Sequence, residues 1–334
     1  MDYDQLKENW NVEQLNIASA VEIIADETRR DQGLKHLTFS SKQNDSIAVG
    51  GVDVSFGDND LAVAVYVVTK GEDVIYQDSI TYTLDVPYIS SYLAFREIEP
   101  LTRLVMKQKE IQPTMTPEVI LVDGNGIFHE RRAGIACFLG VRTNMRTIGV
   151  AKTLYCMDGL NHKVVSKSLE EKLDNFVKKI ESDVDSKRDV RVKSQIEDGV
   201  AFFINSAIQP MSEDREIQSL VNTIETNVRT ISKFCDGFSV PIIDKNGSVL
   251  AAALIAHGAK IGQRSSAGKA KGKGGTKIPI FVSVGHKISL EEAVRVCVST
   301  SYARIPESVR RADLIGREII RTLRQQHQGD NTNG

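Results

Sequence analysis

The sequence has few of the features that identify metal-thiolate, secreted or membrane proteins. Its 334 residues contain four widely spaced cysteines, Cys137, Cys156, Cys235 and Cys297, with no CxxC pair. Such cysteines are typical of reduced thiols in an intracellular protein, and without a histidine- or cysteine-rich ligand set they argue against zinc. No apolar run approaches the roughly 18 residues of a membrane span. The acidic start "MDYDQLKENW" lacks a hydrophobic signal core. We therefore expect no membrane partner and no secretion.

The charge balance also excludes a global attraction to nucleic acid. The formal net charge is −2, so any nucleic-acid partner must be held by a local patch or by a metal ion. With 41% hydrophobic residues the chain can bury a substantial core. We predict one domain over residues 1–330 and a disordered tail at 331–334.

The order of apolar patterns predicts an α/β fold. Residues 2–31 favour one or two helices, and "SIAVGGVDVSFGDNDLAVAVYVV" indicates two strands joined by a hairpin turn. A third strand, "DVIYQDSITYTL", and a helix from Ile89 with a possible disturbance at Pro100 follow. "PEVILVDG" is typical of a central strand, and further strands and two helices complete the pattern, the first helix starting with a capping box at Ser289. This order favours a mixed central sheet flanked by helices.

Two segments interrupt that pattern. Residues 158–236 mix charges of both signs and favour a charged insertion, although an independently folded domain is the alternative. Residues 265–277, "SSAGKAKGKGGTK", are typical of a flexible loop. Five lysines could bring the nucleic-acid backbone to this loop, or the loop is a solvated linker. These lysines are Lys260, Lys269, Lys271, Lys273 and Lys277.

Two aspartates stand out because apolar strands lead into them. Asp53 lies inside "GGVDVSF" and Asp123 ends "ILVDG". A buried carboxylate normally has a partner or a metal, and two of them on neighbouring strands favour a divalent cation such as Mg²⁺. A third carboxylate is needed, and Glu97 and Glu99 in "FREIEP" are both candidates.

Several motifs together resemble the endonuclease V family. They are "GGVDVSF", "VPYISSYLAFRE", "LVDGNGIFHERRAGIACFLGV", "IGVAKT", "SVGHKIS" and "RIPESVRRAD", in the family's order, over roughly residues 48–156 and 238–318. The resemblance implies a ribonuclease H-like fold and Mg²⁺-dependent cleavage of a phosphodiester one nucleotide beyond a deaminated purine, chiefly inosine. The "DGNG" form is similar to eukaryotic members, which favour inosine-containing RNA.

The resemblance also implies roles for individual residues. Asp53, Glu97 and Asp123 match the family's metal-binding carboxylates, and "FRE" selects Glu97 over Glu99. Lys152 in "GVAKT" matches a lysine near the scissile phosphate, or is an ordinary surface lysine. His286 in "SVGHKIS" matches a polar residue at the metal site in some members, or has no chemical role.

A second set of residues is implied in substrate binding. Gly124 and Gly126 would let the backbone approach a flipped base, whose hypoxanthine edge main-chain groups could read. Tyr88, between Pro87 and Ile89, would stack where that base has left the helix, with Leu93 in the same surface. The family's segment is often "PYIP" followed by Gly, and Ser90 and Ser91 depart from it here. Without that Pro and Gly, the segment around Tyr88, which would act as a wedge, is expected to be less rigid.

His129 and Arg131 complete the predicted substrate-binding set. His129 could touch phosphate, form a hydrogen bond within its loop, or do neither. Arg131 and Arg132 could position phosphate, although one of them could pair with an acid.

Several functions remain open on the sequence. The first is a Mg²⁺-dependent inosine-specific endoribonuclease, with Mn²⁺ as a possible substitute and single-stranded RNA as its substrate. The others are a DNA-repair endonuclease acting at deoxyinosine and a non-catalytic binder of inosine-containing RNA. The choice between RNA and DNA depends on contacts to the 2′-hydroxyl, which the sequence does not reveal. We expect a monomer in the cytoplasm, the nucleus or both.

Overall fold

The computed structural model describes most of the chain outside two long gaps. The described residues are 3–24, 47–157, 160, 165, 167, 171, 202–203, 237–244, 246–256 and 278–330. Apart from isolated positions, the predicted insertion at 158–236 lies outside them, as do the loop at 265–277 and the tail at 331–334. The sequence predicts one domain, and the structure divides into two compact units. Unit 1 comprises residues 1–150, 283–289 and 307–334, and unit 2 comprises residues 151–282 and 290–306.

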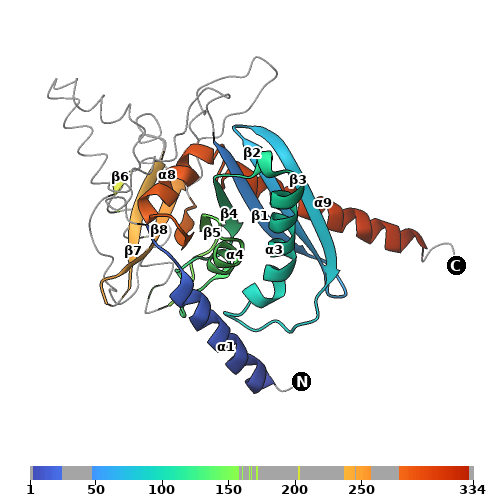
Figure 1. Ribbon diagram of the computed structural model, residues 1–334, viewed down its shortest axis with the longest axis horizontal. Helices are drawn as coiled ribbons and strands as arrows, with labels where there is room; N and C mark the ends of the chain where they lie inside the picture. Colours follow the sequence, from blue (N-terminus) through green and yellow to red (C-terminus); the bar gives the residue numbers. More distant parts are fainter. Residues whose placement is uncertain are drawn as a thin grey trace, which may run out of the picture. The chain divides into compact units, whose positions relative to one another are not determined.

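Unit 1 contains the predicted mixed sheet (Figure 1). Its strands run in the order β3, β2, β1, β4, β5, with bounds β1 Ala48–Phe56, β2 Leu61–Lys70, β3 Asp73–Thr83, β4 Val119–Asp123 and β5 Thr147–Ala151. The first three form an antiparallel meander, as predicted, whereas β1–β4 and β4–β5 pair in parallel. Asn59 and Asp60 turn the β1–β2 hairpin with φ of 55° and 57°, a left-handed conformation that Asn and Asp tolerate.

Helices cover both faces of this sheet. Side chains alternate along a strand, and in β2 the residues Ala64, Tyr66 and Val68 belong to the core formed with α3 (Ala94–Ile111) and α4 (Ile135–Thr143). The intervening Val63, Val65 and Val67 pack against α9 (Glu307–Asp330). The sheet therefore has α3 and α4 on one face and α9 on the other (Figure 1).

The start of α3 corrects the sequence prediction. The helix was expected from Ile89 but begins at Ala94. Ser91 takes a left-handed φ of 63° and interrupts the helical backbone before that point. Pro100 lies inside α3 without ending it, and a short 3₁₀ turn at Pro113–Met115 follows the helix. At the start of the chain, α1 spans Tyr3–Ala20 within the predicted helical region.

Unit 2 contains a further antiparallel hairpin. Its strands β7 (Gly237–Ile243) and β8 (Val249–Ala256) are antiparallel, and Asp244 Oδ1 accepts hydrogen bonds from the Asn246 and Ser248 N–H groups. Strand β8 pairs with β9 (Ile280–His286), and β6 (Phe202–Phe203) pairs with β7. The helix α8 (Leu290–Thr300) begins directly after Ser289, as the capping box predicts. None of the described helices is long and apolar enough to cross a membrane.

Candidate active site

The two strand aspartates are neighbours because their strands pair in parallel. Val52 of β1 is in register with Val122 of β4, so the next residues, Asp53 within β1 and Asp123 at the end of β4, lie side by side. Carboxyl ends of adjacent parallel strands are where α/β folds collect polar groups. The predicted pair is therefore brought together by the sheet itself.

A third aspartate, Asp313, comes from α9 and was missing from the predicted site. One carboxylate oxygen from each of Asp53, Asp123 and Asp313 lies within 4.8 Å of the others. The available signal was the end of "RIPESVRRAD", a motif that supports the resemblance but whose final carboxylate was given no role. Its partners lie far away in the sequence, and spacing alone does not connect them.

Close contact between β1 and α9 makes this arrangement possible. A Cβ on Gly51 would lie 2.2 Å from the carbonyl carbon of Ser308, so only a glycine fits between the strand and the helix start. The Ser308 hydroxyl also donates to the Gly50 carbonyl at 3.1 Å. The helix start is thus fixed on β1 two residues before Asp53, and Asp313 follows within the next two turns.

Glu97, from α3, completes what we call the carboxylate cluster: Asp53, Glu97, Asp123 and Asp313. Glu97 is 6% exposed, and its burial raises its pKa well above the ordinary value, with further contributions from the negative charges of Asp53 and Asp123. Its rival Glu99 is exposed and pairs with Arg142 at 3.4 Å. The structure therefore brings Glu97, and not Glu99, to the aspartates.

The cluster suits a divalent cation. Like-charged carboxylates in a buried site repel one another, and the raised pKa of Glu97 is a consequence of that repulsion and of burial. A cation with a preference for oxygen ligands would compensate these charges. The residues therefore fit the kind of metal that the sequence predicts.

Tyr88 lies exposed in what we call the wedge loop, residues Pro87–Leu93. Its side chain is 68% exposed, and its ring lies 5.7 Å from the Arg96 guanidinium, which also lies 5.5 Å from the Phe56 ring. Leu93 is 39% exposed, while Pro87 and Ile89 are half-buried. Arg96 precedes Glu97 on α3, so this one cation connects the wedge loop, the end of β1 and the carboxylate cluster.

The glycine loop after Asp123 approaches protein backbone closely. A Cβ on Gly126 would lie 2.0 Å from the Val284 carbonyl oxygen, and the Gly126 N–H donates to Ser283 Oγ at 2.8 Å. Gly124 has φ of 141°, and its Cβ would lie 2.6 Å from Ile135. Close packing and backbone conformation therefore require glycine at both positions, independently of any base. Base reading by this loop stays a prediction.

His129 and Arg131 face the wedge loop. His129 is 5% exposed, and burial, with the nearby Arg131 charge, lowers its pKa to about 4. Its Nε2 lies 3.0 Å from the Ser91 carbonyl oxygen, to which Arg131 Nη2 also donates at 2.9 Å. Arg131 additionally pairs with Glu130 and hydrogen-bonds to Gln14. Half-buried Arg132 has a left-handed φ of 57°.

The last two predicted catalytic residues, His286 and Lys152, belong to different compact units. His286 belongs to unit 1, is 3% exposed and accepts a hydrogen bond at Nδ1 from the Glu22 N–H at 3.2 Å. Burial lowers its pKa. Lys152 belongs to unit 2, where its carbonyl oxygen accepts a hydrogen bond from Arg304. Among the described residues, neither joins the acidic group that could hold a metal. Their catalytic roles stay predictions.

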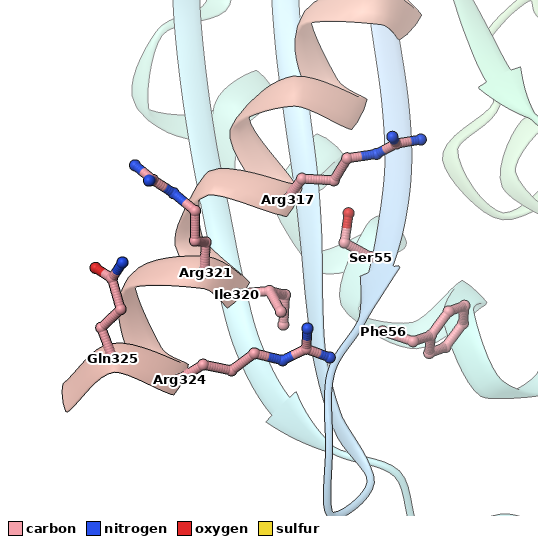
Figure 2. Close-up of a pocket in the computed structure, with 7 residues that line it drawn as sticks. All are labelled: Ser55, Phe56, Arg317, Ile320, Arg321, Arg324 and Gln325. Atoms are coloured by element: carbon pink, nitrogen blue, oxygen red, sulfur yellow. The ribbon is translucent and has the colours of Figure 1, made fainter. Parts of the chain in front are cut away.

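A pocket of about 280 Å³ lies between the end of β1 and α9 (Figure 2). Arg317 and Arg324 extend toward β1 on either side of Ile320, whereas Arg321 points away. Arg317 donates to Asp313 Oδ1 at 2.8 and 3.1 Å. The pocket wall therefore joins the carboxylate cluster through this ion pair. The lining residues are Ser55, Phe56, Arg317, Ile320, Arg321, Arg324 and Gln325.

Comparisons with known proteins agree with this geometry. A family model described as Endonuclease V matches residues 33–193 and 246–314. Human endonuclease V is 33% identical over 82% of this chain and 71% of the human protein, and the mouse protein is 34% identical over 82% of this chain and 60% of its own length.

Solved structures extend the likeness to the fold. The catalytic domain of human endonuclease V matches with a TM-score of 0.60 at 31% identity, covering 95% of this chain and 97% of that one. An Asp-to-Asn variant of Ciona intestinalis endonuclease V matches with a TM-score of 0.61 at 28% identity, covering 97% and 99%. That structure is a complex with a 23-mer DNA containing an inosine followed by a ribo-adenosine. The predicted α/β, ribonuclease H-like fold is thereby confirmed.

Proposed function

This chain belongs to the endonuclease V family, and on that premise we propose that it is a Mg²⁺-dependent endoribonuclease acting on inosine-containing RNA. The family makes it a nuclease and therefore a phosphodiester hydrolase. The proposed cleavage site is the phosphodiester 3′ of the inosine, one nucleotide beyond it. Mn²⁺ is expected to substitute for Mg²⁺, because it accepts the same oxygen ligands.

The carboxylate cluster is the observation that carries this proposal. Asp53, Asp123 and Asp313 offer oxygens within 4.8 Å of one another, and Glu97 is buried beside the first two. A divalent cation held there would polarise the scissile phosphate and favour ionisation of an attacking water. A protein that only bound inosine-containing RNA would have no use for such a group of repelling carboxylates.

The residues of the chain divide this work between them. The three aspartates, fixed on β1, β4 and α9, would contribute the oxygen ligands. Glu97, whose raised pKa favours the protonated form without a compensating charge, would ionise in the loaded site and orient the cluster from the α3 side. Lys152 is proposed to stabilise charge at the phosphate, and His286 to take part from the end of β9.

Base selection is proposed to involve the wedge loop before α3 and the glycine loop after β4. Tyr88, supported by Pro87 and Ile89 and flanked by Leu93, would stack against the bases left in the helix. The loop from Gly124 to Gly126 would line the pocket for the extruded base. The exposure of Tyr88, at 68%, supports this role because a buried ring is unavailable for stacking.

DNA is the second candidate substrate. The Ciona intestinalis relative was solved in complex with DNA that contains an inosine followed by a ribo-adenosine, so DNA is a candidate substrate for this chain too. Recognition of the 2′-hydroxyl would separate the two candidates.

One comparison tests the proposal. Matched single-stranded RNA and DNA oligonucleotides, each with one inosine, are incubated with the protein in Mg²⁺, in Mn²⁺ or in EDTA, and the products are mapped to single-nucleotide resolution. We expect metal-dependent cleavage of the RNA one nucleotide 3′ of the inosine, and none of a matched adenosine RNA. Faster cleavage of the DNA would favour the repair enzyme, and cleavage in EDTA would contradict the metal.

We further propose a monomer that works in the cytoplasm, the nucleus or both. The exposed Cys156 is free, which accords with a reducing compartment. Cys137 and Cys297 are free and buried, and burial raises the pKa of Cys137 to about 12, so these two thiols resist oxidation. Sedimentation of the purified protein and fractionation of cells that express it would test these two statements.

A further inference from the structure

Ser91 holds a conformation that needs outside support. It is one of the described residues other than glycine with positive φ, at 63°. Side chains disfavour this region, and such a conformation persists where the surrounding contacts over-determine it. Ser91 lies three residues after Tyr88 and three before the first residue of α3. A contact that fixes Ser91 therefore fixes the direction in which the wedge loop leaves α3.

Three side chains converge on the carbonyl oxygen of Ser91. Arg131 Nη2 donates to it at 2.9 Å, His129 Nε2 lies at 3.0 Å, and Gln14 Nε2 donates at 3.3 Å. A carbonyl oxygen has two lone pairs, so three donors saturate it. We call Gln14, His129, Arg131 and this carbonyl the Ser91 clamp. Its donors come from α1 and from the loop after β4, and neither segment is adjacent to Ser91 in sequence.

The donors of the clamp are themselves locked. Arg131 Nε donates to Gln14 Oε1, and Gln14 Nε2 also donates to the Ala133 carbonyl at 3.1 Å. Gln14 is 0% exposed, so its amide depends on these partners. The Arg131 guanidinium lies 4.1 Å from the Tyr92 ring centroid. The clamp is therefore a connected network whose members restrain one another.

The protonation of His129 follows from its neighbours. Its Nδ1 accepts a hydrogen bond from the Arg131 N–H at 3.2 Å, which leaves the proton on Nε2, facing Ser91. Burial and the Arg131 charge lower the pKa of His129 to about 4. The ring is thus a neutral donor to Ser91 near neutral pH.

The rest of α1 docks independently of Gln14. Trp10 stacks on Phe95 with ring centroids 4.7 Å apart, and the Tyr92 hydroxyl donates to Asn11 Oδ1 at 2.6 Å. These contacts join α1 to the start of α3 through apolar area. Gln14 can therefore be changed without removing what binds the helix to unit 1.

We propose that Gln14, His129 and Arg131 are positioning residues for the wedge: by clamping the Ser91 carbonyl they fix the direction of Tyr88 before nucleic acid arrives. This inference rests on the proposed function, in which Tyr88 stacks on nucleic acid. In this proposal His129 and Arg131 act through the loop, in place of the direct substrate contact expected from the sequence. A ring that is already oriented loses less conformational freedom on binding.

The first test replaces Gln14 by leucine, which fills the space and removes the three hydrogen bonds of the amide, to Ser91, Ala133 and Arg131. Gln14→Leu should lower kcat/KM for inosine RNA about tenfold, and by no more than Tyr88→Ala lowers it, because the clamp acts through that ring. In a Tyr88→Ala background the same change should lower kcat/KM by less than about twofold. Gln5→Leu, on the exposed side of α1, is the matched control and should leave kcat/KM unchanged.

Two physical readouts separate positioning from folding. The chain has a single tryptophan, Trp10, so its emission reports whether α1 remains docked. Gln14→Leu should leave that emission and cooperative melting in place, while amide hydrogen exchange accelerates within residues 87–93. Exchange is measured without nucleic acid. If the wild-type protein cleaves no inosine substrate, the proposed function fails and the exchange result still decides the clamp.

A second variant protects the test from a folding defect. Arg131→Met keeps an apolar stem beside Tyr92 and removes the donors, and it should reproduce the exchange and kinetic effects of Gln14→Leu. Unchanged exchange in 87–93, or losses that add fully in the Tyr88→Ala background, would overturn the proposal. So would loss of cooperative melting in both variants, because the network would then be a folding element.

Discussion

The carboxylate cluster and the wedge loop belong to the same compact unit, but different structures hold them in place. Asp53 and Asp123 lie next to each other on paired strands, and Asp313 lies on a helix that touches β1 backbone. The wedge loop instead depends on side-chain donors to one carbonyl. Backbone contacts leave the cluster almost no freedom, whereas side-chain contacts can be remade. A metal site requires the first kind of support, and a segment that enters a nucleic acid can use the second.

The largest expected effect comes from emptying the cluster. Asp53→Ala and Asp313→Ala should each lower kcat by about 10³-fold or more, because polarisation of the phosphate by a metal is worth several kcal/mol. Binding of inosine RNA should remain largely intact. Glu99→Ala, an exposed carboxylate two residues from Glu97, is the control and should retain full activity. Single-turnover cleavage measures the loss, and robust turnover by Asp53→Ala would refute the metal assignment.

A smaller effect tests whether backbone contact sets the cluster. Gly51→Ala places a Cβ 2.2 Å from Ser308, so α9 must shift and Asp313 must move from Asp53 and Asp123. A displacement of about 1 Å in a catalytic group can lower activity about 100-fold, and we expect that loss together with a lower Tm.

The control for this change is Gly57→Ala. Its Cβ meets the flexible end of Ile320 at 3.0 Å, so little rearrangement is needed. Equal activity of the two variants would show that α9 is not fixed by its contact with Gly51.

Changes in the wedge loop are expected to lower activity less than changes in the carboxylate cluster. Tyr88→Ala removes a stacking surface worth about 1–3 kcal/mol, so binding should weaken roughly 5- to 150-fold without a change in base preference. Tyr88→Phe should retain most of the binding. The measurement is cleavage of inosine against adenosine RNA by both variants, and a loss of discrimination in Tyr88→Ala would assign base reading to this ring.

The smallest effect concerns stability and pH. Because the pKa of His129 is lowered to about 4 in the folded protein, the unfolded chain binds more protons between about pH 6.5 and pH 4. The free energy of unfolding therefore has its full value, as far as His129 is concerned, above pH 6.5. It falls as the pH is lowered, by about 2 kcal/mol at pH 5. His129→Gln should remove this part of the dependence. Urea unfolding at pH 7.5 and pH 5 measures it, and an unchanged difference would contradict the burial argument.

Much of the sheet and part of the cluster could be predicted from sequence because the signals are local. A carboxylate inside an apolar strand is conspicuous at Asp53 and Asp123, and the two lie side by side on paired strands. The "FRE" motif selected Glu97 over Glu99, and in the structure Glu97 is buried whereas Glu99 is exposed. Asp313 was missed because it lies on an amphipathic helix, where a charged residue is ordinary, and only tertiary contact brings it to the strands.

Gly126 and Ser91 show that contacts between residues distant in sequence could not be predicted. Gly126 was expected to make room for a base, and in the structure it also lies close to the Val284 carbonyl, a contact that the sequence does not predict. Replacement of the family's Pro and Gly by Ser90 and Ser91 raised a doubt about the rigidity of the wedge. The structure places Ser91 in the left-handed region and clamps it from α1. No local pattern connects Gln14 to Ser91, because the contact joins residues 77 positions apart.

The close contact between Gly51 and Ser308 has a consequence for the order in which the protein is made. Asp53, Glu97 and Asp123 leave the ribosome well before α9, so the growing chain has only part of the cluster. Domains fold as units during synthesis, but here the last ligand arrives with a late helix that must dock against β1. On the proposed function, an unfinished chain would therefore lack one of the carboxylates proposed to hold the metal, and the nuclease would become active only once α9 has docked against β1.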